Sequence, residues 1–216
     1  MLIGTTEVVP FHKPRSKVMF PLTLGWCDED MQRVSTIPMR ISTLLKEDFS
    51  TYAAIEGGKF AALRDRNFWA CATYRLAHWA PSIRFALLRR AMCLCSGFLW
   101  LVASTIAGTE IKAGAMIGRR FVIHTSQAIL IADGVIIGDD CTINSGVCIV
   151  HRANSRGEGV PVIGNQVYFG VGCKVLGNIT VGDNVVIGAN AVVLGDVPAD
   201  YTAVGVPAVA KPGRVG

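Results

Sequence analysis

Apolar residues recur at two different spacings along the chain, and the change of spacing divides the chain into two parts. Between about Thr36 and Trp79 they lie three and four apart, which places them on one face of an α-helix. Gly57-Gly58 interrupts this pattern, and Pro81 suits the first turn of a further helix. The pattern predicts three helices, over about 36–56, 60–80 and 81–108.

A period of six residues replaces the helical spacing after about Ile111. A helix cannot place every sixth residue on one face, because six steps of about 100° lead to its opposite side. A three-sided coil with six residues per side places all of them inside, and Gly or Asn after the aliphatic residue suits its turns. The three series are Ile111, Ile117, Ile123; Ile131, Ile137, Ile143, Ile149; and Ile163, Phe169, Val175, Val181, Ile187, Val193.

These periods predict an α+β protein, with an N-terminal α-helical domain followed by a left-handed parallel β-helix of hexapeptide repeats. We expect an irregular, proline-containing lead-in at 1–34, the helical domain at 35–108 and the β-helix at 109–216. The repeat shifts by two residues between Ile123 and Ile131. It breaks again at the polar segment 150–161, which predicts a loop projecting over a binding site.

The composition excludes several classes of function. With 216 residues, 51% of them hydrophobic, the chain has ample material for a core. The net charge of +5 forms no basic stripe, so no nucleic-acid partner is expected. Seven cysteines form no CxxC pair and no metal-ligand spacing. We interpret them as reduced core thiols and expect no metal.

One apolar segment raises the question of a membrane. Residues 91–108 carry no charge, and their length is at the short edge of a membrane span. Because the run contains Ser96 and Thr105 and leads into the repeats, we interpret it as a buried helix, with peripheral membrane contact as the alternative. The amino terminus lacks a secretory signal pattern, so we expect a cytoplasmic protein, with the inner face of the membrane as the alternative location.

Three stretches carry a resemblance to a known family: YRLAHW at Tyr74–Trp79, the repeats, and VVLGDVPADYTAVGVPA at Val192–Ala208. Over about 48–212 the chain resembles the hexapeptide-repeat acyltransferases, most closely the serine acetyltransferase-like and exopolysaccharide O-acetyltransferase branch. The resemblance implies an O-acetyltransferase with acetyl-CoA as acyl donor, bound in a groove between adjacent β-helices of a homotrimer. A dimer of trimers is the alternative assembly.

The resemblance also implies a histidine general base, which removes a proton from the acceptor hydroxyl as that oxygen attacks the thioester directly. His124 lies where the family carries this histidine, and Glu110 matches the acidic residue that orients it. An ungapped alignment places Thr125 at the catalytic position, so we expect Thr125 to contact the substrate. His151, at the start of the predicted loop, is the rival base.

The remaining site residues also follow from the resemblance. Asp48 matches a substrate-binding aspartate of the family's helical domain. Glycines on the path of acetyl-CoA also serve as plain turn residues. The positions that match this path are Gly170, Val171, Gly188, Ala189, Gly205 and Lys211.

The acceptor is assigned from departures from the family pattern. Serine acetyltransferases bind the amino acid through an aspartate before the catalytic histidine and an arginine-histidine pair late in the loop. The matching positions here are Ile123 or His124, then Gly159 and Val160. An amino acid needs charged partners for its ammonium and carboxylate groups. We therefore expect a hydroxyl of a sugar or glycan as the acceptor, in polysaccharide biosynthesis.

Two alternatives stay open. The first is serine O-acetylation in cysteine biosynthesis, for which the short tail after Lys211 predicts no complex with cysteine synthase. The second, from another class, is a non-catalytic hexapeptide-repeat binding or scaffold protein.

Overall fold

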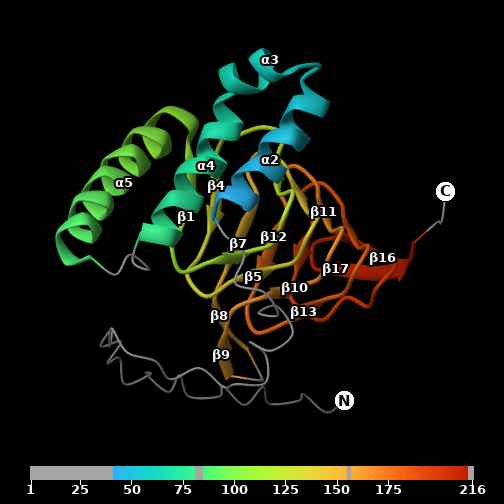
Figure 1. Ribbon diagram of the computed structural model, residues 1–216. Coiled ribbons are helices and arrows are strands. Elements are labelled where there is room, and N and C mark those ends of the chain that lie inside the picture. Colours follow the sequence, from blue (N-terminus) through green and yellow to red (C-terminus); the bar gives the residue numbers. More distant parts are fainter. Residues whose placement is uncertain (1–40, 81–84, 155–156, 214–216) are drawn as a thin grey trace, which may run out of the picture. The chain divides into compact units, whose positions relative to one another are not determined.

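The computed structural model describes residues 41–80, 85–154 and 157–213, and the predicted lead-in lies outside this part of the chain. Residues 37–216 form one compact unit. Within the described residues, four helices precede the strands (Figure 1). They are α2 (Ile41–Ile55), α3 (Lys59–Arg64), α4 (Arg66–Trp79) and α5 (Ala86–Ala107).

The single helix predicted over 60–80 is wrong, because the chain forms two helices that are divided at Asp65. Asp65 has an extended backbone, and its carboxylate accepts a hydrogen bond from Asn67 N at 2.9 Å. This bond satisfies one of the free N–H groups at the start of α4. A capping aspartate therefore begins a new helix where the apolar spacing continued without interruption.

Each turn of the β-helix contributes strands to three parallel sheets (Figure 1). Sheet A contains β1 (Thr109–Ile111), β4 (Ile129–Ile131), β7 (Cys148–Val150), β12 (Lys174–Leu176) and β15 (Val192–Val193). Sheet B contains β2 (Met116–Ile117), β5 (Ile136–Ile137), β10 (Val162–Ile163) and β13 (Thr180–Val181). Sheet C contains β3 (Val122–Ile123), β6 (Thr142–Ile143), β11 (Tyr168–Phe169), β14 (Val186–Ile187), β16 (Tyr201–Gly205) and the antiparallel β17 (Ala208–Pro212).

The inward positions of the repeat stack on one another and form one core. In sheet A, Ile111 pairs with Ile131 and Ile131 with Ile149, so each predicted series lies in register from coil to coil. Ile131 and Ile149 have no exposed surface. A hairpin of β8 (Arg152–Asn154) and β9 (Gly157–Gly159) projects where the loop was predicted. The predicted fold class is confirmed.

The first coil, β1 to β3, forms one end of the β-helix, and no other coil in the described part of the chain pairs with its outer side. Backbone groups buried there need other hydrogen-bond partners. Helix α4 supplies them: Tyr74 Oη donates to the carbonyl of Ala115 at 2.7 Å, and the Arg75 guanidinium donates to the carbonyls of Ile117 and Gly118. The YRLAHW motif thus closes the open end of the β-helix.

A buried ion pair holds this arginine in place. Arg75 Nε lies 3.0 Å from Asp48 Oδ2, and the two side chains are 4% and 1% exposed. The Cys71 thiol also contacts the same carboxylate oxygen, at 3.6 Å. Further along α4, His78 Nδ1 lies 2.8 Å from the carbonyl oxygen of Ala113. Asp48 of α2 thus holds the arginine that bonds α4 to the β-helix, and His78 adds an exposed contact.

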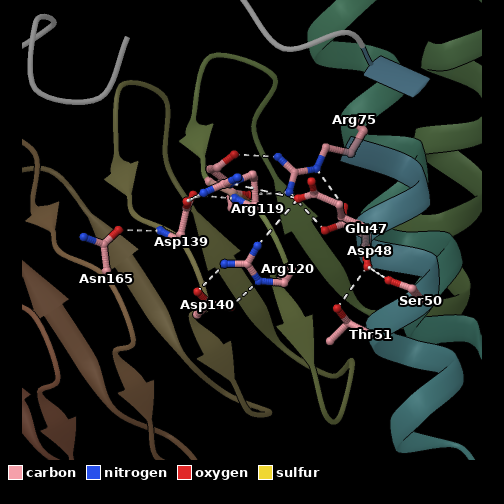
Figure 2. A network of polar contacts seen from close by, with 12 residues as sticks. Glu47, Asp48, Ser50, Thr51, Arg75, Arg119, Arg120, Asp139, Asp140 and Asn165 are labelled. Carbon is pink, nitrogen blue, oxygen red and sulfur yellow. Dashed lines mark hydrogen bonds and ion pairs between the residues drawn. The ribbon is translucent and has the colours of Figure 1, made fainter. Parts of the chain in front are cut away.

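A second group of contacts between α2 and the β-helix is half-exposed (Figure 2). Glu47 Oε2 lies 3.7 Å from Arg120 and 4.0 Å from Arg119, and the two arginines pair with Asp140 and Asp139 of the next coil. The hydrogen bond between Arg120 and Asp140 raises the pKa of the guanidinium and lowers the pKa of the carboxyl. Exposed pairs of this kind stabilise little, so the buried Arg75 contacts carry more weight.

Helix α5 differs from the buried helix that we expected. Leu87, Leu94 and Phe98 are mostly exposed, whereas Ser96 faces inward and is buried. An apolar pattern alone does not say which side of a helix is covered, which is why the expectation was wrong. Among the described residues, no helix is long and apolar enough to cross a membrane.

The interpretation of the cysteines as core thiols is confirmed for some positions only. Cys71, Cys141 and Cys173 are buried and free. Burial raises the pKa of the Cys141 and Cys173 thiols to about 12, which keeps them protonated and unreactive at neutral pH. Cys93 and Cys95 are exposed on α5, so the interpretation is wrong for these two.

Replacing Arg75 tests the closure of the open end. We expect Arg75→Ala to lower the free energy of unfolding by about 3–5 kcal/mol, because it leaves the Asp48 carboxylate buried without its partner. Urea denaturation followed by circular dichroism measures this change. Lys46→Ala, which removes an exposed cation from α2, is the matched control and should stay within about 0.5 kcal/mol of the parent chain. Equal stability of both variants would contradict the closing role.

Candidate active site

One edge of the β-helix, where sheet C turns into sheet A, carries most of the predicted site residues. Strand pairing places the residues that follow the inward aliphatics of sheet C in one column: His124, Asn144, Gly170, Gly188 and Val204. We call this column and the turns beside it the C–A edge. The structure therefore brings the predicted base onto the same edge as the predicted path of acetyl-CoA.

The predicted cofactor-binding residues lie on the lower coils of this edge or beside it. Val171 and Ala189 are exposed in the turns of successive coils, and Gly205 is exposed at the end of β16. Lys211 is exposed on β17, opposite Thr202 of β16. These positions offer backbone groups along the edge and one positive charge near its far end.

Coil stacking by itself explains two of the glycines. A Cβ atom on Gly170 would lie 2.6 Å from the backbone nitrogen of Ala189 and 2.7 Å from the carbonyl oxygen of Ile187. A Cβ atom on Gly188 would lie 2.7 Å from a side-chain carbon of Val204. The backbone of the next coil therefore requires glycine at position 170, whether or not a ligand binds, whereas at position 188 the Val204 side chain would have to shift.

The top of the C–A edge is longer than the turns beneath it. Inward-facing Ile123 is followed by buried Ile129, whereas the equivalent Ile143 of the next coil is followed by Val147 only four residues later. The two extra residues leave both His124 and Thr125 exposed. The two-residue shift in the sequence thus corresponds to a projecting turn that presents the predicted base.

Glu110 lies on the outer side of sheet A, paired in register with Leu130. Its carboxylate forms an ion pair with Lys112 at 2.5 Å, and this hydrogen bond raises the pKa of the lysine. Within the described residues, the ion pair of Glu110 is with Lys112 and not with His124. Glu110 also lines a pocket of about 420 Å³ that reaches Ala128 on the C–A edge.

His151 and Asp48 lie away from this edge. His151 is exposed where β7 ends and the chain turns toward sheet B, so it occupies a different edge from His124 of the same chain. Asp48 is buried in its pair with Arg75, so a substrate could reach it only after that pair opens. The role of His151 as a base and the role of Asp48 in substrate binding therefore stay predictions.

Two helical residues that contact the C–A edge were missed by sequence reasoning. Tyr52 Oη accepts a hydrogen bond from Ile123 N at 2.8 Å, and Asn67 bonds to the backbone on both sides of Thr125. Burial raises the pKa of the Tyr52 hydroxyl well above its ordinary value. Tyr52 looked like one more apolar position of its helix, and no motif signalled Asn67.

Known proteins match this chain over most of its length. A family model described as bacterial transferase hexapeptide (six repeats) matches residues 161–195. A serine acetyltransferase of Helicobacter pylori is 44% identical over 136 residues, which cover 63% of this chain and 75% of that protein. The chain belongs to the serine acetyltransferase family. It is therefore an acyltransferase of the hexapeptide-repeat type, as the resemblance implied.

Solved structures of this family have the same arrangement of helices and β-helix. A Brucella abortus serine acetyltransferase in complex with coenzyme A matches with a TM-score of 0.68 and 28% identity, over 80% of this chain and 68% of that one. A soybean serine acetyltransferase complexed with serine matches with a TM-score of 0.67 and 26% identity, over 79% and 69%.

The expected glycan acceptor is wrong. Relatives at 37–44% identity and the solved structures that match this chain are serine acetyltransferases, which supports the serine alternative instead. The expectation gave three missing charged positions more weight than the similarity of the whole domain. Charged residues at particular positions are a weak guide to the identity of the acceptor, because a different side chain can reach the same ligand from another element.

Replacing Gly170 tests whether coil stacking requires this glycine. We expect Gly170→Ala to lower the free energy of unfolding by about 1–3 kcal/mol in the absence of any ligand, because its Cβ would meet the backbone of the next coil. Gly195→Ala is the matched control, since no atom lies within 4 Å of a Cβ there. Thermal unfolding in ligand-free buffer compares the two. If both variants unfold together with the parent chain, the glycine is not needed for stacking.

Proposed function

We propose that this chain is an acetyl-CoA-dependent serine O-acetyltransferase whose reaction takes place on the C–A edge. The observation that carries the assignment is the 44% identity with a serine acetyltransferase over 136 residues, which cover 63% of this chain. The exposed His124 at the top of the edge supplies a side chain suited to the reaction. The coenzyme A and serine in related structures are the source of the proposed ligands.

In the proposed reaction, His124 acts as the general base. Its imidazole takes the proton from the serine hydroxyl while the oxygen attacks the thioester carbonyl of acetyl-CoA. The tetrahedral intermediate then collapses, the carbon–sulfur bond breaks, and the imidazolium returns the proton to the leaving sulfur. O-acetylserine and coenzyme A leave, and His124 is restored to its neutral form.

Glu110 has the proposed role of orienting the imidazole and stabilising its charged form. To do so, its carboxylate has to turn from Lys112 toward the C–A edge. The Glu110–Lys112 pair is about 40% exposed on both sides, and exposed pairs contribute only about 0–1 kcal/mol. Releasing the lysine is therefore easy. Thr125, exposed beside the base, has the proposed role of a hydrogen-bonding contact to the acceptor.

The proposed assembly is a homotrimer with acetyl-CoA between the C–A edge and a neighbouring chain. Tyr168, Val171 and Val186 are apolar and 42–50% exposed on sheet C and this edge, which favours contact with a second copy. Lys211 would supply positive charge for the phosphates of the donor. In such an assembly, His124 and His151 of one chain would lie on different edges of its β-helix.

Single replacements of the two histidines test this reaction. We expect His124→Ala to lower kcat for L-serine by about 10²–10⁴-fold, because it removes the general base. His151→Ala should keep most of the activity. Release of coenzyme A from acetyl-CoA, followed with a thiol reagent at millimolar L-serine, measures both.

The opposite pattern would make His151 the base and overturn the role of His124. Full activity of the double variant would overturn histidine base catalysis altogether. If the parent chain binds acetyl-CoA but releases no thiol with L-serine, the serine assignment is wrong. Absence of any acetyl-CoA binding would favour a non-catalytic scaffold.

A further inference from the structure

The turn that carries His124 lies at the open end of the β-helix. In β3, the backbone nitrogens of Val122 and His124 donate to carbonyls of the coil below. The nitrogen of Ile123 faces the other way, where there is no coil, and it donates to Tyr52 instead. The backbone that leads into the turn is therefore held by a helical side chain rather than by a strand.

Asn67 continues this support into the turn itself. Its Nδ2 donates to the carbonyl oxygen of His124 at 3.2 Å, and its Oδ1 accepts from Ser126 N at 2.9 Å. One planar amide thus spans Thr125 and restrains the residue on either side. Asn67 is itself held, because its own backbone nitrogen donates to the capping carboxylate of Asp65.

The turn carries features that oppose its observed conformation. The Ser126 hydroxyl is buried, and among the described residues it has no hydrogen-bond partner. Ala128 has a φ of 52°, in the left-handed region that favours glycine, whereas the equivalent turns below have Gly146 and Gly172 there. A turn with such strain keeps its shape only where neighbouring contacts impose it. The Asn67 amide provides two of those contacts.

From these contacts we infer that Asn67 is a positioning residue, which sets the direction of His124 and Thr125 toward the acceptor. This role rests on the proposed serine acetylation. The Asn67 side chain bonds to the backbone of His124 and Ser126, so it acts through the turn and not on the reacting groups. Because reacting atoms have to meet within a few tenths of an ångström, a small shift of the turn lowers the rate strongly.

Asn67→Ala removes both bonds and is the main test. We expect kcat for L-serine to fall by about 10–100-fold, while the KM for acetyl-CoA changes less than about twofold. The residues on the proposed path of acetyl-CoA lie on lower coils, and coil stacking supports these coils. The KM for acetyl-CoA should therefore stay constant. The ring signals of His124 in long-range ¹H–¹⁵N spectra, assigned by loss in His124→Ala, should move, and those of His151 should not.

Two further variants make the test specific. Asn67→Asp keeps the acceptor for Ser126 N but turns a carboxylate oxygen toward the His124 carbonyl, so it should lose at least as much activity as the alanine variant. Arg66→Ala changes the exposed neighbouring position on α4 and should keep the parent kcat and the parent His124 signals.

Parent-like kcat in Asn67→Ala would overturn the positioning role. A loss of activity with unchanged His124 signals and a large fall in melting temperature would also overturn it, since Asn67 would then be merely structural. If the parent chain does not acetylate serine but the His124 signals move in Asn67→Ala, the proposed function fails and the support of the turn stands.

Discussion

The hydrogen-bonding of the first coil is the constraint on which the rest of this structure depends. Within the β-helix, each coil satisfies the backbone of the next, as between Ile131 and Ile149. The first coil has a partner on one side only, and unpaired buried backbone groups are costly. Tyr74 and Arg75 replace the missing coil with side chains. The helical segment is therefore a polar closure of the β-helix as well as a separate set of helices.

The helical segment also reaches the candidate active site, through residues other than those that close the first coil. Tyr52 and Asn67 hold the turn that presents His124, while coil stacking holds the lower part of the C–A edge around Gly170 and Gly188. Different contacts therefore hold the residues proposed to act on the acceptor and the residues proposed to bind acetyl-CoA. Changes in the helices can alter the position of the base without altering the coils below it.

Exposed apolar side chains mark the surfaces that a single chain leaves uncovered. Val171 and Tyr168 lie open on or beside the C–A edge, and α5 presents Leu94 and Phe98 outward. The first pair lies where the proposed donor and neighbouring chain would meet. A single chain also keeps His124 and His151 on separate edges. In the proposed trimer, a neighbouring chain would complete the site on this edge.

The sequence by itself determined the β-helix, its projecting hairpin and the extra length beside His124. A six-residue period repeats in register over many coils, and each inward residue needs only the residues directly above and below it. Motif similarity in the sequence also suggested His124 and the path of acetyl-CoA, but only strand pairing placed them on one edge. Only the tertiary structure decided the division of the helix at Asp65, the exposed face of α5, the burial of Asp48 and the role of Asn67. These features depend on contacts between residues far apart in the chain, such as Asn67 with Ser126. The local spacing of apolar residues does not predict such contacts.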